Sequence, residues 1–590
     1  MAGNAKKSVP DKSYLNLRQR LELLRSQLDN ERVTFKPQWR DLADYILPRR
    51  PRFFVTDVNK GDRRNQKILD TTPTMAARTL SAGMMSGVTS PARPWFRLTI
   101  SDRELAEDGE VKMWLDAVQN IISTSFLKSN LYNVLPIIYG DMGVFGTSCM
   151  FVEEDFTGEV MKFHPFPIGS YMISQNEKLK VDTFYREFQM TVRQMIEKFG
   201  YDTPGGEIQW DRFSTGVKSL YEKSQLETWV GVAHAITKNK DYDETKLQSK
   251  FKKYSSTYYE RGTMGSANNT LSDLDQTTYL SQSGFDYFPA LAPRWEVTGE
   301  DVYGTNCPGM VALGDVKQLQ NGERKALQAI EKSINPPMTG PSSLRNQSAS
   351  LLPGDITYLD VNSGQQGFRP AYEIRFDIGA MESKQAQVRD RISKAFFEDL
   401  FLMMASSDRR QITATEVDER REEKMLALGP VLERINDDLL DPLLDIAFKI
   451  HVDQGLLPEP PEKIRGSDLK IEYLSIMAQA QKIVGIGGVD RFAAFIGQHA
   501  QIDPSVLDKY DMDQAADVYA DMTAVPPSIV RTDEAVAAMR QQRAEQQAQQ
   551  QKLAAMEQMA GAAKDLSAAK TDDESALTQI LGNPDIVTGR

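Results

Sequence analysis

The sequence predicts a mostly helical α+β protein made of several structural units. Glycine-separated segments rich in β-branched and aromatic residues accompany amphipathic helices over residues 1–308, and two long helical segments flank a short insert farther along. The 590 residues exceed what one ordinary hydrophobic core accommodates. With 41% hydrophobic and 26% charged residues, the composition is typical of a globular protein, so most of the chain is expected to fold.

Two amphipathic helices are expected within residues 13–47, because apolar residues recur at helical spacing and Pro37 interrupts the pattern. The apolar positions are Leu17, Leu21, Leu24, Leu28, Trp39, Leu42 and Ile46. The basic stretch that follows, residues 48–54, is interpreted as a solvated turn with prolines as punctuation.

The rest of the first half is expected to alternate helices and strands. The expected segments are a helix over 69–80 ending in a glycine- and proline-punctuated stretch, a short strand up to 100, a helix over 111–139, strands over 140–173, and mixed helix and strand over 181–304. This half therefore reads as an α+β domain.

A helix, an insert and a second helix follow. The first helix covers 314–337 and stops at a double proline, and the second covers 378–404. Their apolar positions are Val316, Leu319, Leu327 and Ile330 in the first, and Met381, Val388, Ile392 and Phe396 in the second. The insert is rich in Pro, Gly and Ser, with a strand expected at 351–361.

The C-terminal third is expected to be mostly helical. A capping box at Thr413 and Glu416 predicts the start of a long helix that kinks near Pro430 or Pro442. A strand is expected at 469–475, followed by helices to about 530. Residues 533–563 are rich in Ala and Gln, so this tail is expected to be helical and to need neighbours or stay mobile.

The sequence contains no motif that predicts catalysis, a metal or a cofactor. It lacks a GxxxxGK[ST] phosphate loop and a GxSxG elbow, and its acidic runs are interpreted as solvated faces. Cys149 and Cys307 lie outside any metal-ligand spacing. The four histidines are scattered and are interpreted as structural: His164, His234, His451 and His499.

Composition and charge favour a soluble protein from a reducing, cytosolic origin. The N-terminus resembles no secretory signal, and no apolar run is long enough for a membrane span. The net charge of −12 argues against a protein whose whole surface grips nucleic acid, although it permits one past which DNA slides. The basic break at Arg409 and Arg410, between two long helices, is either a solvated turn or a loop that presents guanidinium groups to phosphates.

Four long motifs identify a resemblance that extends from near the N-terminus to about residue 545. They are AGMMSGVTSPARPWFRL at 82–98, NPPM at 335–338, ITATEVDERREEKMLALGPVLERINDDLLDPLL at 412–444, and VPPSIVRTDEAVAAMRQQRA at 525–544. In these motifs and in their order, the chain resembles the head-to-tail connecting (portal) proteins of podovirus-type bacteriophages.

The resemblance implies a portal fold with a wing, a two-helix stem, a clip, a tunnel loop and a helical crown. Carried onto this chain, the parts are 1–308 for the wing, 309–336 and 376–402 for the stem, 337–375 for the clip, 403–412 for the tunnel loop, 413–475 for a long helix and wing return, 476–532 for the crown, and 533–590 for a tail or barrel.

The resemblance also implies a non-enzymatic ring, usually a dodecamer, at one capsid vertex of the virion, assembled in the host bacterial cytoplasm. Double-stranded DNA would pass through it during packaging and ejection, and its protein partners would be terminase, the major capsid and scaffolding proteins, and tail adaptor or nozzle proteins. The expected DNA contacts are Arg409, Arg410, Lys384, Arg391 and Lys394. The alternatives are another structural capsid or tail component, or a DNA-processing enzyme.

Overall fold

Helix α1 (Leu17–Tyr45) opens the computed structural model and continues through Pro37, so the break expected there is wrong. Packing on both sides of the proline explains the continuity. Trp39 is fully buried and donates its indole N–H to the carbonyl oxygen of Phe145 at 3.1 Å. Its ring centroid lies 5.7 Å from that of Phe35 and 5.1 Å from that of Tyr303. These contacts hold the helix although Pro37 can donate no backbone hydrogen bond.

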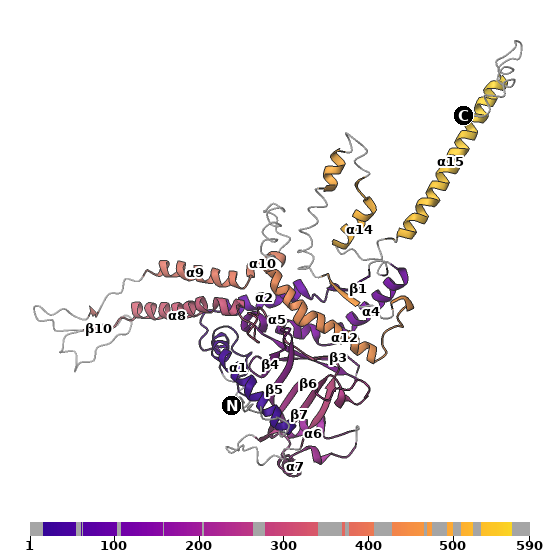
Figure 1. The fold of residues 1–590 in the computed structure, drawn as a ribbon. Helices are drawn as coiled ribbons and strands as arrows, with labels where there is room; N and C mark the ends of the chain where they lie inside the picture. The colour runs from indigo at the N-terminus through magenta and orange to yellow at the C-terminus, as the bar shows by residue number, and fades with distance from the viewer. Residues whose placement is uncertain are drawn as a thin grey trace, which may run out of the picture. The chain divides into compact units, whose positions relative to one another are not determined.

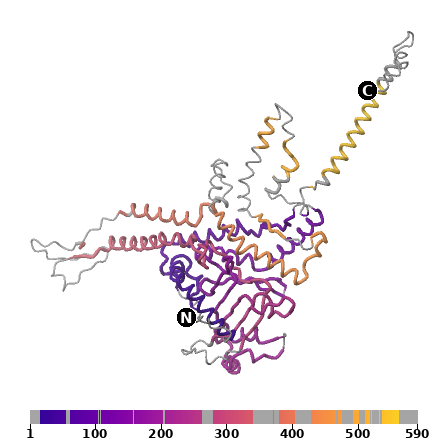
Figure 2. The backbone as a smooth tube through the Cα atoms, viewed as in Figure 1, coloured from indigo at the N-terminus to yellow at the C-terminus, as the bar shows by residue number. Residues whose placement is uncertain are grey.

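The structure describes most of the chain, in two units. The described residues are 16–54, 61, 63–102, 105, 108–156, 158–202, 206–263, 278–339, 369–371, 377–405, 428–464, 469–474, 492–499, 509–522, 531 and 533–568. The first unit consists of Met1–Asp102 and Met113–Gly485, and the second of Arg103–Lys112 and Ile486–Arg590. Figures 1 and 2 trace both units in chain order.

Helix α2 (Thr72–Val88) extends beyond the end expected at residue 80, because Gly83 lies against another helix rather than ending α2. A Cβ built on Gly83 would overlap the ring of Phe401, so only glycine allows that ring to approach so closely. The AGMMSG motif is thus a helix–helix contact surface. After it comes β1 (Phe96–Ile100), as expected. The single helix expected over 111–139 is instead two helices, α4 (Gly109–Lys128) and α5 (Leu131–Phe145).

The described strands of the first unit form four sheets, all with antiparallel neighbours, one of which is a short pair in the insert. The strand predicted at 469–475 is β12 (Leu469–Tyr473), which pairs with β1. A three-stranded sheet has the order β3 (Val160–Phe166), β2 (Cys149–Asp155), β9 (Ala290–Leu291). A five-stranded sheet has the order β4 (Tyr171–Gln175), β5 (Val181–Thr191), β6 (Trp229–Lys238), β7 (Tyr254–Thr263), β8 (Ser281–Phe285). The strands expected over 140–173 begin only at Cys149, because residues 140–145 belong to helix α5, and the mixed helix and strand expected over 181–304 is present.

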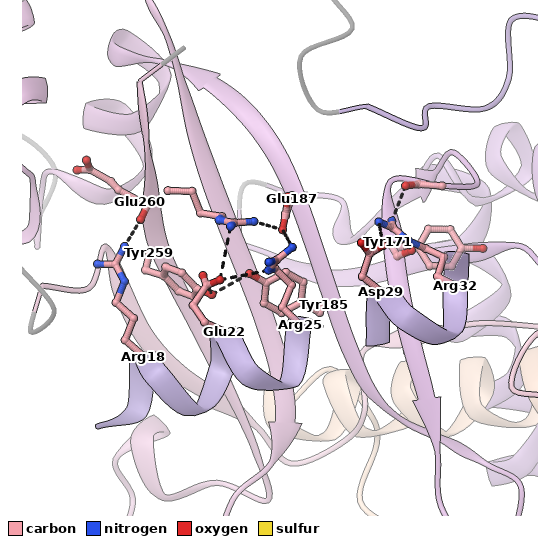
Figure 3. A network of polar contacts seen from close by, with 12 residues as sticks. Arg18, Glu22, Arg25, Asp29, Arg32, Tyr171, Tyr185, Glu187, Tyr259 and Glu260 are labelled. Carbon is pink, nitrogen blue, oxygen red and sulfur yellow. Dashed lines mark hydrogen bonds and ion pairs between the residues drawn. The ribbon is translucent and has the colours of Figure 1, made fainter. Parts of the chain in front are cut away.

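Helices cover both faces of the five-stranded sheet. α6 (Val192–Phe199) and α7 (Thr215–Glu222) pack against one apolar cluster, while Leu21 and Leu28 of α1 pack against another that includes Tyr259. Charged groups line the α1 contact (Figure 3): the Tyr259 hydroxyl donates to Glu22 at 2.8 Å, and Arg261 pairs with Glu187. The five-stranded sheet is thereby fixed to the N-terminal helix.

The two helices around the insert are α8 (Pro308–Ile334) and α9 (Ile378–Ala395), as expected, and they lie side by side (Figure 1). The second was expected to continue to 404, but it ends before Phe397, whose φ of 56° is left-handed. The chain resumes as α10 (Glu398–Ala405). Of the insert, only β10 (Met338–Thr339), β11 (Arg369–Pro370) and adjacent residues are described, so the strand expected at 351–361 lies outside the described residues.

The regular α-helical hydrogen bonding is interrupted before Pro442, one of the two prolines near which a kink was expected. Residues 428–435 are helical, Asn436–Leu440 form a π-helical turn, and α12 (Asp441–Asp453) follows. The capping box at Thr413 lies outside the described residues. Short 3₁₀ turns occur at Trp210–Arg212, Ser249–Phe251 and Glu462–Ile464.

The described parts of the second unit are helical, as the sequence predicts. They include residues 492–499, α14 (Met512–Met522) and α15 (Asp533–Ala568). Arg540 of α15 pairs with Asp513 of α14 at 2.6 Å. From Gln541 to Gly561 every side chain of α15 is exposed.

Candidate nucleic-acid interface

A polar cluster joins the α8–α9 pair to the start of α2. The amide of Gln320, only 2% exposed, accepts from the backbone N–H groups of Leu69 and Asp70 at 2.7 and 2.9 Å and donates to the Asp70 carbonyl at 2.8 Å. The Asp70 carboxylate accepts from Arg389 of α9 at 2.7 Å, and Arg389 also donates to Glu323 of α8 at 2.6 Å. Thr72 and Arg389 together hold the pKa of Asp70 below its usual value despite partial burial, which raises it.

Beyond this cluster α8 has no buried side chain, since none of its residues from 321 to 334 is buried. On α9 the described side chains before Gln385 are not buried, whereas Gln385, Val388 and Ile392 are. We call residues 321–334 and 378–394 the free arm. It carries seven basic and four acidic residues, a net charge of +3 in a chain whose net charge is −12.

Two of the predicted DNA contacts on α9 are already paired with carboxylates. Arg391 donates to Asp315 of α8 at 2.7 Å, and this hydrogen bond raises the pKa of the guanidinium. Lys394 donates to Asp390 at 2.7 Å, which raises the pKa of its ammonium. Both side chains are exposed, so these pairs are weak and exchangeable.

Lys384 is exposed and has no ion-pair partner within the described part of the chain. It therefore presents a freer charge than Arg391 or Lys394 do. Arg409 and Arg410 lie outside the described residues.

Three further basic residues of the free arm were not singled out from the sequence: Arg324, Lys325 and Lys332 of α8. All three are exposed. The signal that could have found them is the excess of positive charge on one helix of an acidic protein.

The two buried histidines have structural partners. His234 is fully buried, stacks on Tyr258 with ring centroids 3.7 Å apart, and burial holds its pKa well below the usual value. His451 lies 2.7 Å from the Ser125 hydroxyl. The described residues include no group of three or more His, Cys, Asp or Glu side chains placed to hold a metal ion. Among the described helices, none has the length and apolar character that a membrane span requires.

Comparison with known proteins agrees with the predicted resemblance. Residues 18–530 match the family described as bacteriophage head to tail connecting protein. The chain is 48% identical over 555 residues to the portal protein of Salmonella phage epsilon15, an alignment that covers 94% of this chain and 96% of that protein. It is 43% identical over 554 residues, with the same coverage of each chain, to the "Probable portal protein" of Bordetella phage BPP-1. With a match across this much of its length, the chain belongs to the family of bacteriophage head-to-tail connecting proteins.

Proposed function

We propose that this protein is the portal subunit of its phage: a ring, at one capsid vertex, through which the genome is packaged and ejected. Family membership supports the connector function, which is structural rather than enzymatic. We further propose that the ring contains twelve copies and assembles in the host cytoplasm. Its partners would be terminase, capsid and scaffolding proteins, and tail adaptors.

The observation that carries the ring is an apolar face that the single chain leaves uncovered. On α8, Leu327, Ile330 and Ile334 are 57%, 38% and 71% exposed. Ile334 lies eighteen residues after the buried Val316, about five helical turns, so the two lie on the same side of the helix. The apolar face by which the start of α8 packs against the rest of the first unit thus continues along residues 321–334, where its apolar side chains are exposed. We call Leu327, Ile330 and Ile334 the seam.

A neighbouring copy in a ring would bury the seam. Full burial of a Leu or Ile side chain is worth about 1.5 to 3 kcal/mol, and a cyclic assembly repeats the same contact at each interface. Three such side chains per subunit therefore contribute several kcal/mol to each contact, before the entropic cost of association.

The parts of the chain follow from the resemblance. We assign 309–336 and 376–402 to the stem, which α8 and α9 support, 337–375 to the clip, 403–412 to the tunnel loop, 1–308 with 413–475 to the wing and its return, 476–532 to the crown and 533–590 to the tail. A ring of twelve would carry a net charge of about −144, which suits a conduit that DNA slides through with little sticking.

Electron microscopy of the purified full-length protein tests the proposal. Wild-type protein is expected to form rings with a central channel. Leu327→Asp is expected to abolish rings while leaving the circular dichroism spectrum unchanged, because it places a charge in the seam. Leu247→Asp is the matched control, since Leu247 is 99% exposed in the β6–β7 connection. Wild-type protein that remains monomeric, or rings formed equally by both variants, would contradict the proposal.

The clip assignment has its own test. A chain that lacks residues 337–375 is expected to fold and to lose docking of the packaging motor. Normal packaging by that deletion variant would remove the assignment and leave the ring proposal standing.

A further inference from the structure

A basic surface of the first unit lies where α1 ends. Arg40 of α1 and, in the segment that follows, Arg49 and Arg52 are exposed, and none of the three has an ion-pair partner within the described residues. The guanidinium carbon of Arg40 lies 5.6 Å from the ring centroid of Phe53 and 5.2 Å from that of Phe54, which is 61% exposed. We call Arg40, Arg49 and Arg52 the arginine patch.

The segment that carries this patch is fixed to the rest of the first unit. Arg50 donates two hydrogen bonds of 2.7 Å to the buried Asp141, and Pro51 is buried. The backbone N–H of Arg52 donates to the carbonyl oxygen of Ile168 at 3.0 Å. The backbone beneath the patch is therefore ordered before any partner arrives, so that binding costs only the ordering of side chains.

An acidic surface lies around the start of α12. Asp437, Asp441 and Asp445 are four residues apart, and none has an ion-pair partner within the described part of the chain, although Asp441 accepts from the Tyr473 hydroxyl. Burial and the charge of Asp437 raise the pKa of Asp441, and burial and Asp441 raise that of Asp445, while Lys180 lowers both. Like charges at this spacing repel one another. We call the three carboxylates the acidic ladder.

The two surfaces lie on opposite flanks of α1. Glu31 and Arg40 are nine residues apart, about two and a half turns, so they lie on opposite sides of the helix. The Glu31 side faces Asp301, whose charge, after burial, raises the pKa of Glu31. Arg294 donates to the carbonyl oxygen of the residue after Asp301 at 3.4 Å and pairs with Asp438, the neighbour of the ladder in sequence. The acidic ladder therefore lies on the flank away from the arginine patch.

We propose that the arginine patch of one subunit binds the acidic ladder of the next, so that neighbouring subunits of the ring are joined by a second contact besides the seam. This inference rests on the proposed function, because a ring brings opposite flanks of two copies together. A closed ring needs two different, complementary surfaces on each subunit, and every copy then uses both.

A second copy of this chain suits both surfaces at once. The planar fork of arginine matches a carboxylate with two hydrogen bonds, and arginine beside aromatic side chains is typical of the residues that dominate protein interfaces. Nucleic acid would satisfy the patch and leave the repulsion within the ladder unrelieved. Charge complementarity between the two surfaces therefore favours the neighbouring subunit as the partner of both.

Exchange of charge between two full-length chains tests the proposal. The patch variant carries Arg40→Glu with Arg52→Glu, and the ladder variant carries Asp437→Lys with Asp445→Lys. Each variant alone places like charges at every interface, so the fraction of protein in rings should fall roughly tenfold or more, measured by size-exclusion chromatography and electron microscopy. Mixed in equal amounts, the two variants should form rings again, because a reversed patch meets a reversed ladder when the copies alternate.

The matched control is Lys240→Glu with Lys250→Glu, which makes the same charge change as the patch variant on the exposed β6–β7 connection. It should form rings alone and should not carry the ladder variant into rings. Rings formed by the patch variant alone overturn the proposal. So does a mixture that forms no rings although both variants keep the wild-type circular dichroism spectrum.

Cross-linking supplies a second readout that does not depend on charge reversal. Both native cysteines are buried, and burial raises the pKa of Cys307 to about 12 and raises that of Cys149 as well, so background reaction is low. In rings, a chain with Arg52→Cys and Asp445→Cys is expected to give covalent multimers with a flexible bis-maleimide, whereas each single variant should give monomers. Monomers alone from the double variant, or multimers from a single one, overturn the proposal.

The outcomes separate the two levels of inference. Absence of rings in wild-type protein removes the proposed function and the patch–ladder contact together. Wild-type rings that the patch variant forms equally well remove the contact alone. If the patch variant forms rings normally and loses affinity for a short DNA duplex, the patch is a nucleic-acid surface and the proposal is wrong.

Discussion

Arg294 donates to both carboxylate oxygens of Asp438, at 3.1 and 3.2 Å, from a position with no solvent exposure. The same guanidinium donates to the side chain of Gln175 at 2.7 Å and to the Leu179 carbonyl at 2.6 Å. Asp438 lies in the π-helical turn before α12, so one arginine links the β4–β5 turn to this interruption of the α-helix. A π turn widens the local backbone. In this protein the π turn contains Asp438, whose carboxylate neutralises the buried guanidinium of Arg294.

Replacement of Arg294 by Met tests the importance of this pair. The variant leaves the nearly buried Asp438 carboxylate without its cation, so we expect a loss of about 3 to 5 kcal/mol in the free energy of unfolding. The measurement is urea unfolding followed by tryptophan fluorescence. Arg193→Met, which breaks exposed pairs with Glu197 and Glu227, should change the midpoint little. Adding Asp438→Leu to Arg294→Met should recover part of the loss; no recovery would show that Asp438 is not the stranded group.

The contact between Gly83 and Phe401 predicts a steric effect. Gly83→Ala places a methyl group where the Phe401 ring lies, so the ring or α10 must shift, and overpacking of this kind costs roughly 1 to 3 kcal/mol. Phe401→Leu alone should also destabilise the protein, because the phenylalanine is only 4% exposed. The double variant should lose less stability than the sum of the losses in the two single variants. Strict additivity in thermal unfolding would show that the two residues do not meet.

The helices were predictable where local pattern decides them. Helix α8 follows from its apolar spacing and the double proline at its end, and the interruption of the α-helix before Pro442 follows from the missing proline N–H. The extension of α2 was not predictable, because Gly83 reads as punctuation until Phe401 of another helix is placed against it. The break at Phe397 also has no local signal, since phenylalanine does not favour a left-handed conformation.

The candidate interface was predictable in residue type but not in pairing state. In the sequence, Lys384, Arg391 and Lys394 are equivalent cations on one helix. Only the packing of α8 on α9 shows that Arg391 forms an ion pair with Asp315. The seam was likewise predictable in residue type but not in its exposure. Leu327 and Ile330 were recognised as apolar positions, and the structure adds that the single chain leaves them exposed.

A buried ion pair gives the protein a measurable pH dependence. Arg50, in the stretch interpreted as a solvated turn, donates two hydrogen bonds of 2.7 Å to Asp141, so that interpretation is wrong for this residue. Burial raises the pKa of Asp141 to about 6 from the usual 3.8, although Arg50 lowers it. A raised folded-state pKa means that the folded protein binds the proton more tightly. The stability from this group is therefore present below about pH 4 and lost as the pH rises to about 6.

Asp141→Asn isolates that contribution. Two pKa units correspond to about 3 kcal/mol in all, of which the wild-type protein should lose about 2 kcal/mol of unfolding free energy relative to the variant between pH 4 and pH 6. Urea midpoints of the two proteins at several pH values give the difference. A difference that stays constant across the range would mean that Asp141 titrates normally despite its burial.

Replacement of Pro37 is expected to stabilise the protein. It is exposed within the continuous helix α1, where it donates no hydrogen bond to the turn before it. Pro37→Ala restores that donor and removes the clash with the preceding turn, which costs about 3 kcal/mol in an ordinary helix interior. The alanine chain is freer when unfolded, which takes back roughly 0.4 to 1 kcal/mol. We therefore expect a net gain of about 2 kcal/mol in unfolding free energy, read as a higher urea midpoint. Gln38→Ala, the adjacent exposed position, should change it by a few tenths of a kcal/mol at most. A loss of stability in Pro37→Ala would mean that the proline ring itself shapes α1 against the sheet, and that the packing of Trp39 depends on a bend which alanine does not reproduce.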